Sequence, residues 1–409
     1  MGGVVEIEIP AAEARERLVG FVGEVVGCLS HVRQRENALV YVRGLIEYGG
    51  RKSLQPTLFR MGAPSARYES VQQFLADSPW EADALVRALA RRVVPAIDCQ
   101  ALVIDDTGFP KDGRASPGVK RQYSGTLGKV GNCQIGVSLH AVGWRGTQPV
   151  GWALYLPEEW CDDAERRRGA KIPEGVVFQT KPELAAGLIE RAASWDIPQV
   201  PVLGDQAYGD NTALRTRLDA QTVDYVLAVG PATGVFGPGT VFAVPARRPG
   251  RGRPPARLRP DRRPEAAQAL ASRLPPDAFT TITFTTGPRG TTRTGRFAFI
   301  RVYAAHPILH DHLPPREEWL IVEWPDGAKE PAGYWLSNLP HDTPTQRLAQ
   351  LARLRWVIEL DYRQLKGELG LDHYEGRSYA GWHHHTALVS VAHAFLTLER
   401  LRPKARRPT

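Results

Sequence analysis

The first part of the chain repeats apolar residues at spacings of three and four, which is typical of amphipathic helices. Three such stretches lie at residues 13–28, 39–48 and 80–93. The third has a helix-start signal, because Ser78 can cap it and Pro79 suits its first turn. These patterns predict a separate all-helical N-terminal domain over residues 1–97.

From residue 99 the pattern changes to short apolar runs bounded by turn-forming residues, which predicts β-strands. Strands are expected at 101–106, 133–142, 150–156, 200–205 and 225–229, with helices at 181–195 and near 211–219. Three strands followed by alternating helices and strands predict the α/β class. The expected core is a mixed five-stranded sheet with flanking helices, as in the RNase H-like fold. In such a sheet the first and fourth strands can be parallel neighbours.

Residues 230–340 interrupt this alternation. They begin with an Arg/Pro-rich loop at 245–264, which holds eight Arg, six Pro and a single Asp. Strand-like runs follow at 279–284, 296–303, 319–324 and 333–336, which predict a β-rich insertion. The domains expected are 1–97, the core at 98–229, the insertion at 230–340, the second part of the core at 341–401 and a basic tail at 402–409.

Helical spacing returns after the insertion. It begins at Thr345, continues through Glu359 towards Leu371, and a last apolar helix is expected at about 386–401. The core is therefore expected to be completed by helices at the end of the chain.

The composition is that of a globular protein, with 409 residues and 43% hydrophobic content. No apolar run approaches the roughly 18 residues of a membrane span, and the N-terminus lacks the pattern of a signal peptide. The four cysteines are far apart, which argues against a structural zinc site or a disulfide framework. We therefore expect a cytoplasmic protein with no membrane partner.

The net charge is +8, from 52 Lys and Arg against 44 Asp and Glu. Arg dominates over Lys, and its planar fork of donors suits phosphate recognition. A genome rich in G and C also enriches Arg, so the charge alone does not decide the class of partner.

Acidic residues close two of the predicted strands. Asp105 and Asp106 end the first, and adjacent carboxylates repel each other unless a cation such as Mg²⁺ neutralises them. Strand alternation places them on opposite faces, so only one can point at a shared site. Asp205 ends the fourth strand, where a lone Asp is more often a turn or helix cap than a metal ligand. Parallel pairing of the two strands would bring Asp106 and Asp205 side by side.

A third acid, Glu359, lies within a helical pattern. Arg355 precedes it by four positions and Lys366 follows it by seven, so the three are expected on one helix face. An exposed ion pair of roughly a few tenths of a kcal/mol would explain this spacing. The apolar residues around Glu359 instead indicate a helix pressed against a core. A carboxylate there, with two cations beside it, suits a metal ligand flanked by phosphate contacts.

These motifs resemble those of the DDE transposases of bacterial insertion sequences. The likeness lies in Asp-Asp-Thr-Gly at Asp106, Gly-Asp-Gln-Ala-Tyr-Gly at Asp205 and Arg-Trp-Val-Ile-Glu at Glu359. One group of these enzymes has a third motif that reads Tyr, two residues, Arg, three residues, Glu, six residues, Lys. This chain matches that spacing, except that Ala352 stands at the Tyr position. The group also carries a β-rich insertion between its second Asp and its Glu.

The resemblance implies a transposase that cleaves phosphodiesters at insertion-sequence ends and joins the 3′-OH to target DNA. It implies two Mg²⁺ or Mn²⁺ ions held by Asp106, Asp205 and Glu359. Asp105 is the alternative at the first position, although family precedent favours the Asp before Thr. By the same resemblance, Arg355 and Lys366 would hold phosphates near the scissile bond. These are the residues on which the expected chemistry depends.

The partners implied are double-stranded DNA, as terminal inverted repeats and as target, and a second copy of the chain. A homodimer on DNA is therefore expected, within the bacterial nucleoid. Residues 1–97 are expected to form a DNA-binding domain.

Further contacts to DNA are expected from basic loops. Arg251 and Arg253 flank a glycine in Arg-Gly-Arg-Pro, the core of a motif that enters A·T minor grooves. A solvated Arg/Pro loop that meets phosphates without base preference explains the same residues, and is the interpretation we favour. Lys120, Arg121 and Lys129 are placed to meet the substrate backbone, although a loop Lys is usually only solvated.

Two aromatic or imidazole features allow a structural explanation beside a functional one. Trp335 could stack an unpaired base near the cut, whereas a Trp buried in a β-domain is commoner. The consecutive His383, His384 and His385 point three ways on a helix and cannot form one tetrahedral metal site. Phosphate contact or packing at the helix start is expected for them.

Two other functions compete with transposition. One is a domesticated descendant that holds DNA without cutting it, and retention of all three acids argues against that. The other is an RNase H-like nuclease without strand transfer. Only the long insertion and the presence of Arg355 and Lys366 beside Glu359 argue against it.

Overall fold

The structure is a computed structural model that describes residues 11–47, 49–126, 128–246, 257–287, 290–305 and 316–402. Arg251, Arg253 and nearly all of the basic tail lie outside the described residues. The four cysteines are free, in keeping with their predicted lack of disulfides. No described helix combines the length and the apolar character that a membrane crossing requires.

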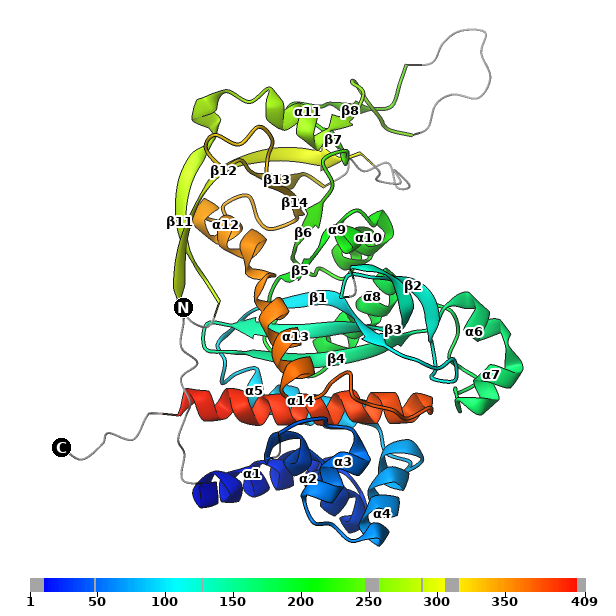
Figure 1. Cartoon of the computed structure of the whole chain (residues 1–409). Helices are drawn as coiled ribbons and strands as arrows, with labels where there is room; N and C mark the ends of the chain where they lie inside the picture. The colour runs from blue at the N-terminus through cyan, green and yellow to red at the C-terminus, as the bar shows by residue number, and fades with distance from the viewer. Residues whose placement is uncertain are drawn as a thin grey trace, which may run out of the picture.

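Helices make up the N-terminal region, as the apolar spacing predicts. They are α1 (Ala11–Val25), the 3₁₀ turn η1 (Val26–Cys28), α2 (Val32–Glu47), α3 (Leu54–Arg60), α4 (Ser65–Ala76) and α5 (Ala82–Val93). Of these, α1, α2, α4 and α5 contact the long helix α14 (Tyr379–Leu401). α14 lies between α1–α4 and the sheet, whereas α5 packs on the sheet directly (Figure 1). The apolar side chains of the N-terminal helices share one buried cluster with those of the sheet, and the domain boundary at residue 97 stays a prediction.

Five strands form the centre of a mixed sheet, in the order β4–β3–β1–β5–β6. They are β1 (Cys99–Pro110), β3 (Lys129–Gly143), β4 (Thr147–Tyr155), β5 (Val202–Gly204) and β6 (Tyr225–Val229). β3 is antiparallel to β1 and β4, whereas β5 is parallel to β1 and β6. The first and fourth expected strands are therefore parallel neighbours, as predicted. A short strand, β2 (Lys120–Ser124), pairs with the start of β3.

The β-rich insertion continues this sheet. β14 (Gly333–Ser337) pairs with β6, followed by β13 (Glu318–Glu323), β12 (Thr291–Ala304) and β11 (Thr280–Thr286), all antiparallel. Within the described residues the sheet thus has twelve strands instead of the five expected. The physical reason is that β6 would otherwise leave a row of backbone groups unpaired, and β14 covers that edge. Smaller elements complete the insertion: β7 (Gly234–Phe236), β8 (Phe242–Ala243), β9 (Arg259–Pro260), β10 (Glu265–Ala266), α11 (Ala267–Ser272) and η2 (Pro276–Ala278).

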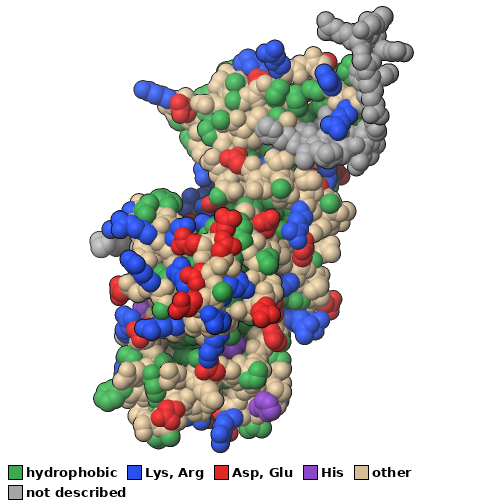
Figure 2. Space-filling view, turned by 90° about the vertical axis from the view of Figure 1, so that its right-hand side faces the viewer, with side chains coloured by type: hydrophobic (Ala, Val, Ile, Leu, Met, Phe, Trp, Pro, Cys, Tyr) green, Lys and Arg blue, Asp and Glu red, His purple; other side chains and the backbone are tan. Residues whose placement is uncertain are grey.

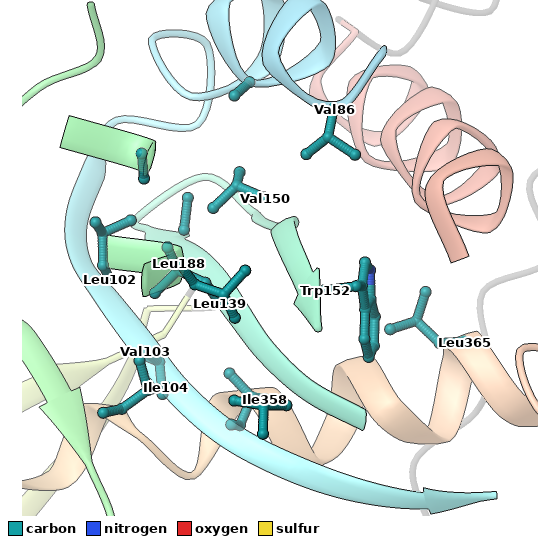
Figure 3. Packing of buried hydrophobic residues seen from close by; sticks show 14 of the residues in the cluster. Val86, Leu102, Val103, Ile104, Leu139, Val150, Trp152, Leu188, Ile358 and Leu365 are labelled. Atoms are coloured by element: carbon teal, nitrogen blue, oxygen red, sulfur yellow. The ribbon is translucent and has the colours of Figure 1, made fainter. Parts of the chain in front are cut away.

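Helices cover both faces of the central strands. α8 (Lys181–Ala193) packs on β3 and β4, where its Leu188 lies beside Leu139 (Figure 3). α13 (Val357–Gly367) packs on the other face, where the hydroxyl of Tyr362 is 2.6 Å from that of Ser138. The remaining helices are α6 (Glu158–Asp162), α7 (Ala164–Gly169), α9 (Gln206–Gly209), α10 (Thr212–Ala220) and α12 (Thr345–Leu354).

The helix expected to run from Thr345 past Glu359 is broken into two. α12 ends at Leu354 and α13 begins at Val357. Between them the N–H of Glu359 donates to the carbonyl of Trp356 at 3.2 Å, a tighter turn than that of an α-helix. Arg355 therefore lies outside α13, and Glu359 lies in its first turn.

Candidate active site

Parallel pairing brings the end of β5 beside β1. β1 does not end at Asp106, as expected, but continues to Pro110 in pairing with β3. Leu102 pairs with Val202 and Val103 with Leu203, so the chain leaves β5 beside the part of β1 that carries Asp105 and Asp106. Asp205 follows β5 directly and caps the short helix α9. The side-by-side placement predicted from the sequence is confirmed for the strands.

Asp105 faces α13. In the register of β1 and β3 it stands opposite Ser138, which contacts α13 through Tyr362. Its Oδ2 atom accepts a hydrogen bond from Nη1 of Arg355 at 2.6 Å, and only 8% of the residue is exposed. Burial raises the pKa of the Asp105 carboxyl to about 7; the Arg355 charge opposes that rise and the Asp205 charge adds to it.

Asp106 faces α8. It stands opposite Val137, on the same side of the sheet as Leu139, which packs against α8. Its Oδ2 atom is 2.8 Å from Nζ of Lys181, the first residue of α8. Sequence reasoning missed Lys181. The capping signal of Thr180 and Glu183 marks the helix start, but nothing in the spacing places that start beside Asp106.

Asp205 is linked electrostatically to both aspartates of β1. Its Oδ1 atom accepts the N–H of Ala207 at 2.9 Å, as a helix cap does. Burial raises the pKa of the Asp205 carboxyl, the Arg355 charge lowers it and the Asp106 charge raises it. Asp205 can therefore cap helix α9 and also belong to the site that it shares with the aspartates of β1.

Glu359 is the most open of the acids. Its side chain is 58% exposed, and its Oε1 atom lies 3.5 Å from both terminal nitrogens of Arg355. Arg355 thus stands between Asp105 and Glu359 and contacts both. It reaches Glu359 across the turn between two helices, which corrects the expectation that both lie on one continuous helix face.

Lys366 reaches the same strand from the end of α13. Its Nζ atom donates to the carbonyl of Gly108 at 2.7 Å and to Oγ1 of Thr126 at 3.3 Å. Burial lowers the pKa of the Lys366 ammonium to about 8. The structure therefore places both cations of the third motif along β1, beside the acids.

The donor atoms at this site suit a hard divalent cation, because carboxylate oxygens are the ligands that Mg²⁺ and Mn²⁺ prefer. Burial raises the pKa of both Asp105 and Asp205, and a neighbouring carboxylate adds to each rise, Asp205 for Asp105 and Asp106 for Asp205. A bound cation would relieve this repulsion. Among the described residues, however, no three His, Cys, Asp or Glu side chains stand close enough to hold a metal ion. Arg355 and Lys181 occupy carboxylate oxygens instead, so a metal ion would have to displace them.

Comparison with known proteins identifies the family. Residues 24–291 match the family described as DDE superfamily endonuclease. The chain belongs to this family. A relative, "Probable transposase for insertion sequence element IS701" from Microchaete diplosiphon, is 30% identical over 164 residues, which are 39% of this chain and 40% of the relative. The chain thus matches well under half of that relative's length.

The family match covers Asp105, Asp106 and Asp205 and ends before Glu359. Within this DDE superfamily member, Glu359 is therefore supported by its motif and by its contact with Arg355. Arg355 in turn contacts Asp105, which lies inside the matched segment.

A hollow of about 310 Å³ lies beside Asp205 in this endonuclease family member. Trp335 and Trp356 line it together with three arginines, Arg293, Arg353 and Arg355. Trp335 is 8% exposed, and the Arg353 guanidinium lies 5.7 Å from its ring centroid. Trp335 is thus both a packed residue of β14 and part of the wall of a cavity next to the acids. Ala352, at the Tyr position of the third motif, lines the same hollow.

The basic residues of β2 lie on a surface of mixed charge. Lys120 is 2.8 Å from Glu159 of α6, and Arg121 is exposed. Figure 2 views the side of the molecule that carries α6 and α7 in Figure 1, and acidic and basic side chains alternate across its middle. Lys129 begins β3 and is exposed. This face is not a continuous basic surface.

The histidine run packs helix α14. The ring nitrogens of His384 lie 2.8 Å from the carbonyls of Leu75 and Trp80, and His385 bonds Tyr41 and the Leu371 carbonyl. Burial lowers the pKa of His383 and of His385 to about 3. The predicted packing role is confirmed.

Proposed function

We propose that this chain is a transposase that cleaves phosphodiesters at insertion-sequence ends and joins the freed 3′-OH to target DNA. The observation that carries the proposal is that Arg355 joins Asp105 of β1 to Glu359 of α13, while β5, which Asp205 follows, pairs with β1 and Lys366 bonds the carbonyl of Gly108 in β1. Membership of the DDE superfamily endonucleases and the name of the relative support it.

The core is proposed to be of the RNase H-like type. Support comes from the strand order β4–β3–β1–β5–β6, with three antiparallel strands first and two parallel crossovers after them. The insertion between Asp205 and Glu359 agrees with the transposase group that the third motif resembles. In this layout Asp205 stands where the chain leaves β5, beside Asp105 and Asp106 within β1.

Asp106, Asp205 and Glu359 are the proposed ligands of two Mg²⁺ or Mn²⁺ ions, with Asp105 as the rival at the first position. Bound ions would lower the pKa of the attacking water and stabilise the leaving 3′ oxygen. Asp106 is favoured because it is more exposed than Asp105, whose Oδ1 and Oδ2 atoms already bond the Asp106 N–H and Arg355.

Arg355 and Lys366 are proposed to bind phosphates around the scissile bond. The guanidinium presents two parallel donors, which match a phosphate as they match the carboxylates that they contact now. Lys366 offers a single charge at Gly108, further along β1. Two cations at separate points of one strand would orient the DNA backbone along β1.

Other DNA contacts are proposed for Trp335, Lys120 and Arg121. The hollow beside Asp205 places an aromatic wall and several arginines next to the acids, which suits an unpaired base and its phosphate. Arg251 and Arg253 keep their proposed role as phosphate or minor-groove contacts. The helical region at 1–97 is proposed to bind DNA, and two copies of the chain are proposed to act together on paired ends.

The test uses Asp205→Asn, because Asn caps a helix as well as Asp does and so preserves the start of α9. DNA that carries the inverted repeats flanking the reading frame is the substrate. The transposase proposal predicts normal binding of this DNA but no Mg²⁺-dependent cleavage by the variant. Unchanged cleavage would contradict it.

A second assay separates the competing functions. A precut end with a free 3′-OH is offered together with a plasmid, and joining to the plasmid excludes a nuclease without strand transfer. A wild-type protein that binds the ends but neither cuts nor joins them is the domesticated DNA-binding protein.

A further inference from the structure

We propose that Lys181 is a further active-site cation, which neutralises Asp106 in the absence of a divalent ion and contacts a DNA phosphate when the ion is bound. The inference deepens the proposed function, because it assigns a residue outside the three motifs to the same site.

The pair is formed by two side chains that stay accessible. The Nζ atom of Lys181 lies 2.8 Å from Oδ2 of Asp106, and the side chains are 32% and 21% exposed. Neither is sealed into the core, so the contact can open without unpacking the sheet. An exposed pair of this kind is weak enough for an ion to compete with it.

The backbone at Lys181 is fixed. Thr180 caps α8 and accepts the N–H of Glu183, while the Glu183 carboxylate accepts the Thr180 N–H at 2.7 Å. Pro182 occupies the first turn and restricts it further. Only the flexible four-carbon stem of Lys181 is therefore free to move its charge between Asp106 and a nearby phosphate.

Helix stability does not account for a lysine at this position. A positive charge in the first turn faces the positive end of the helix dipole and weakens the helix slightly. The acid of that turn, Glu183, accepts hydrogen bonds from the N–H and the hydroxyl of Thr180. The favourable partner of Lys181 is Asp106, on another element and 75 positions away in the chain.

Each acid of β1 has a cation of its own. Arg355 bonds Asp105 from the α13 face and Lys181 bonds Asp106 from the α8 face. A divalent ion would replace the charge that Lys181 supplies to Asp106. DNA would then supply the negative phosphate that an uncompensated ammonium requires.

The first experiment measures the binding of Mn²⁺ to the full-length protein by titration calorimetry in the absence of DNA. Lys181→Met removes the charge with little change of volume, and it should tighten Mn²⁺ binding about two- to fivefold, because the competing cation is gone. Lys181→Arg keeps the charge and should match the wild type. Lys171→Met is the matched control: Lys171 is 62% exposed and paired with Asp77, at another place on the surface.

The second measurement is binding of end DNA in Ca²⁺ over a range of KCl concentrations. Lys181→Met should weaken binding several-fold, and the slope of log K against log[KCl] should fall by about one, as expected for one lost phosphate contact. Lys171→Met should keep the wild-type slope. Thermal unfolding is followed for each variant, and Lys181→Gln replaces Lys181→Met if the latter does not fold.

Wild-type values for Lys181→Met in either the Mn²⁺ titration or the salt slope would overturn the proposal. Equal effects of Lys181→Met and Lys171→Met would overturn it as well, since net charge would then explain them. If the wild type cuts end DNA, these results overturn only the role of Lys181. If the wild type neither binds nor cuts DNA, the proposed function itself fails, and the phosphate contact of Lys181 fails with it because there is no DNA binding to support.

Discussion

Glu359 and Asp361 stand two residues apart on α13, yet their carboxyl groups lie in opposite environments. Glu359 is 58% exposed and lies 3.5 Å from Arg355. Asp361 is buried beneath the helix, where it accepts a hydrogen bond from Thr147 at 2.5 Å and contacts Nδ1 of His140 at 3.0 Å. A separation of two residues turns a side chain to nearly the opposite side of a helix, which explains how one helix serves both.

The difference divides the acids into two groups. We call an acid open when its carboxyl group is partly exposed, like that of Glu359, and closed when it is buried and hydrogen-bonded, like that of Asp361. Thr147 and His140 come from β4 and β3, so the buried contacts of Asp361 fix the rotation of α13 on the sheet. That rotation points Glu359 outwards, towards Arg355 and Asp105. Asp106 and Asp205 belong with Glu359 to the open acids, whereas Glu318 in β13, which accepts from Tyr225 at 3.1 Å, is closed like Asp361.

The largest effect is expected from an open acid. Asp106→Asn should reduce Mg²⁺-dependent cleavage by on the order of a thousandfold, about 4 kcal/mol of transition-state stabilisation, because a ligand charge is lost. Asp105→Asn should cost only about tenfold, because it weakens one of the two contacts of Arg355 but removes no ligand. Single-turnover cleavage of end DNA measures both rates.

The pair of variants also tests the choice between the two aspartates. Each changes one carboxylate to an amide of the same size, and binding of end DNA shows that the variant protein is folded. A thousandfold loss in Asp105→Asn with little loss in Asp106→Asn would reverse the assignment. It would move the ligand to the face of β1 that already holds Arg355.

The next effect is on stability and comes from a closed acid. Asp361→Ala leaves Thr147 and His140 without their partner in the core, which should lower the free energy of unfolding by about 2 to 4 kcal/mol. Urea denaturation followed by tryptophan fluorescence measures it. Glu359→Gln is the control on the same helix, and it should change the unfolding free energy by less than about 0.5 kcal/mol. Equal losses in the two variants would remove the distinction between open and closed acids.

The local part of the site was predictable from the sequence. The apolar run before Asp205 identifies the end of β5, and the order of strands and helices makes β1 and β5 parallel neighbours. The expected end of the first strand at Asp106 was wrong, because β1 continues to Pro110 in pairing with β3. The helices of the N-terminal region were predictable as well, because the apolar spacing that indicates each helix lies within one continuous segment of the sequence. The spacing of the motif around Glu359 was likewise readable, but the single continuous helix expected to carry it was wrong, because Arg355 lies between α12 and α13.

Long-range partners were not predictable. The contact of Lys181 with Asp106 depends on how α8 crosses the sheet, which no local spacing records. The break at Arg355 is also invisible, because the apolar spacing continues through Trp356 and the turn tightens only in the folded chain. The pairing of β14 with β6 depends on an edge that exists only after the central sheet has formed.

The smallest effect is a pH dependence of stability that comes from Glu318. Burial raises the pKa of this carboxyl from 4.5 to about 7; the Arg215 and Arg316 charges and the Tyr225 hydrogen bond oppose the rise, and the Asp219 charge adds to it. Between these values the folded state keeps a proton that the unfolded state has lost. The stabilisation is therefore full below pH 4.5 and is lost as the pH rises through 7, at about 1.4 kcal/mol per pH unit.

Glu318→Gln keeps an acceptor for Tyr225 but cannot titrate, so its stability should depend less on pH. Between pH 5 and pH 7 the wild type should lose about 2 kcal/mol more unfolding free energy than the variant. Urea denaturation at the two pH values measures the difference, and the raised pKa of Asp105 cancels because both proteins contain it. Parallel pH profiles would show that Glu318 is ionised in the folded chain. The distinction between closed and open acids would then rest on hydrogen bonding alone and not on protonation.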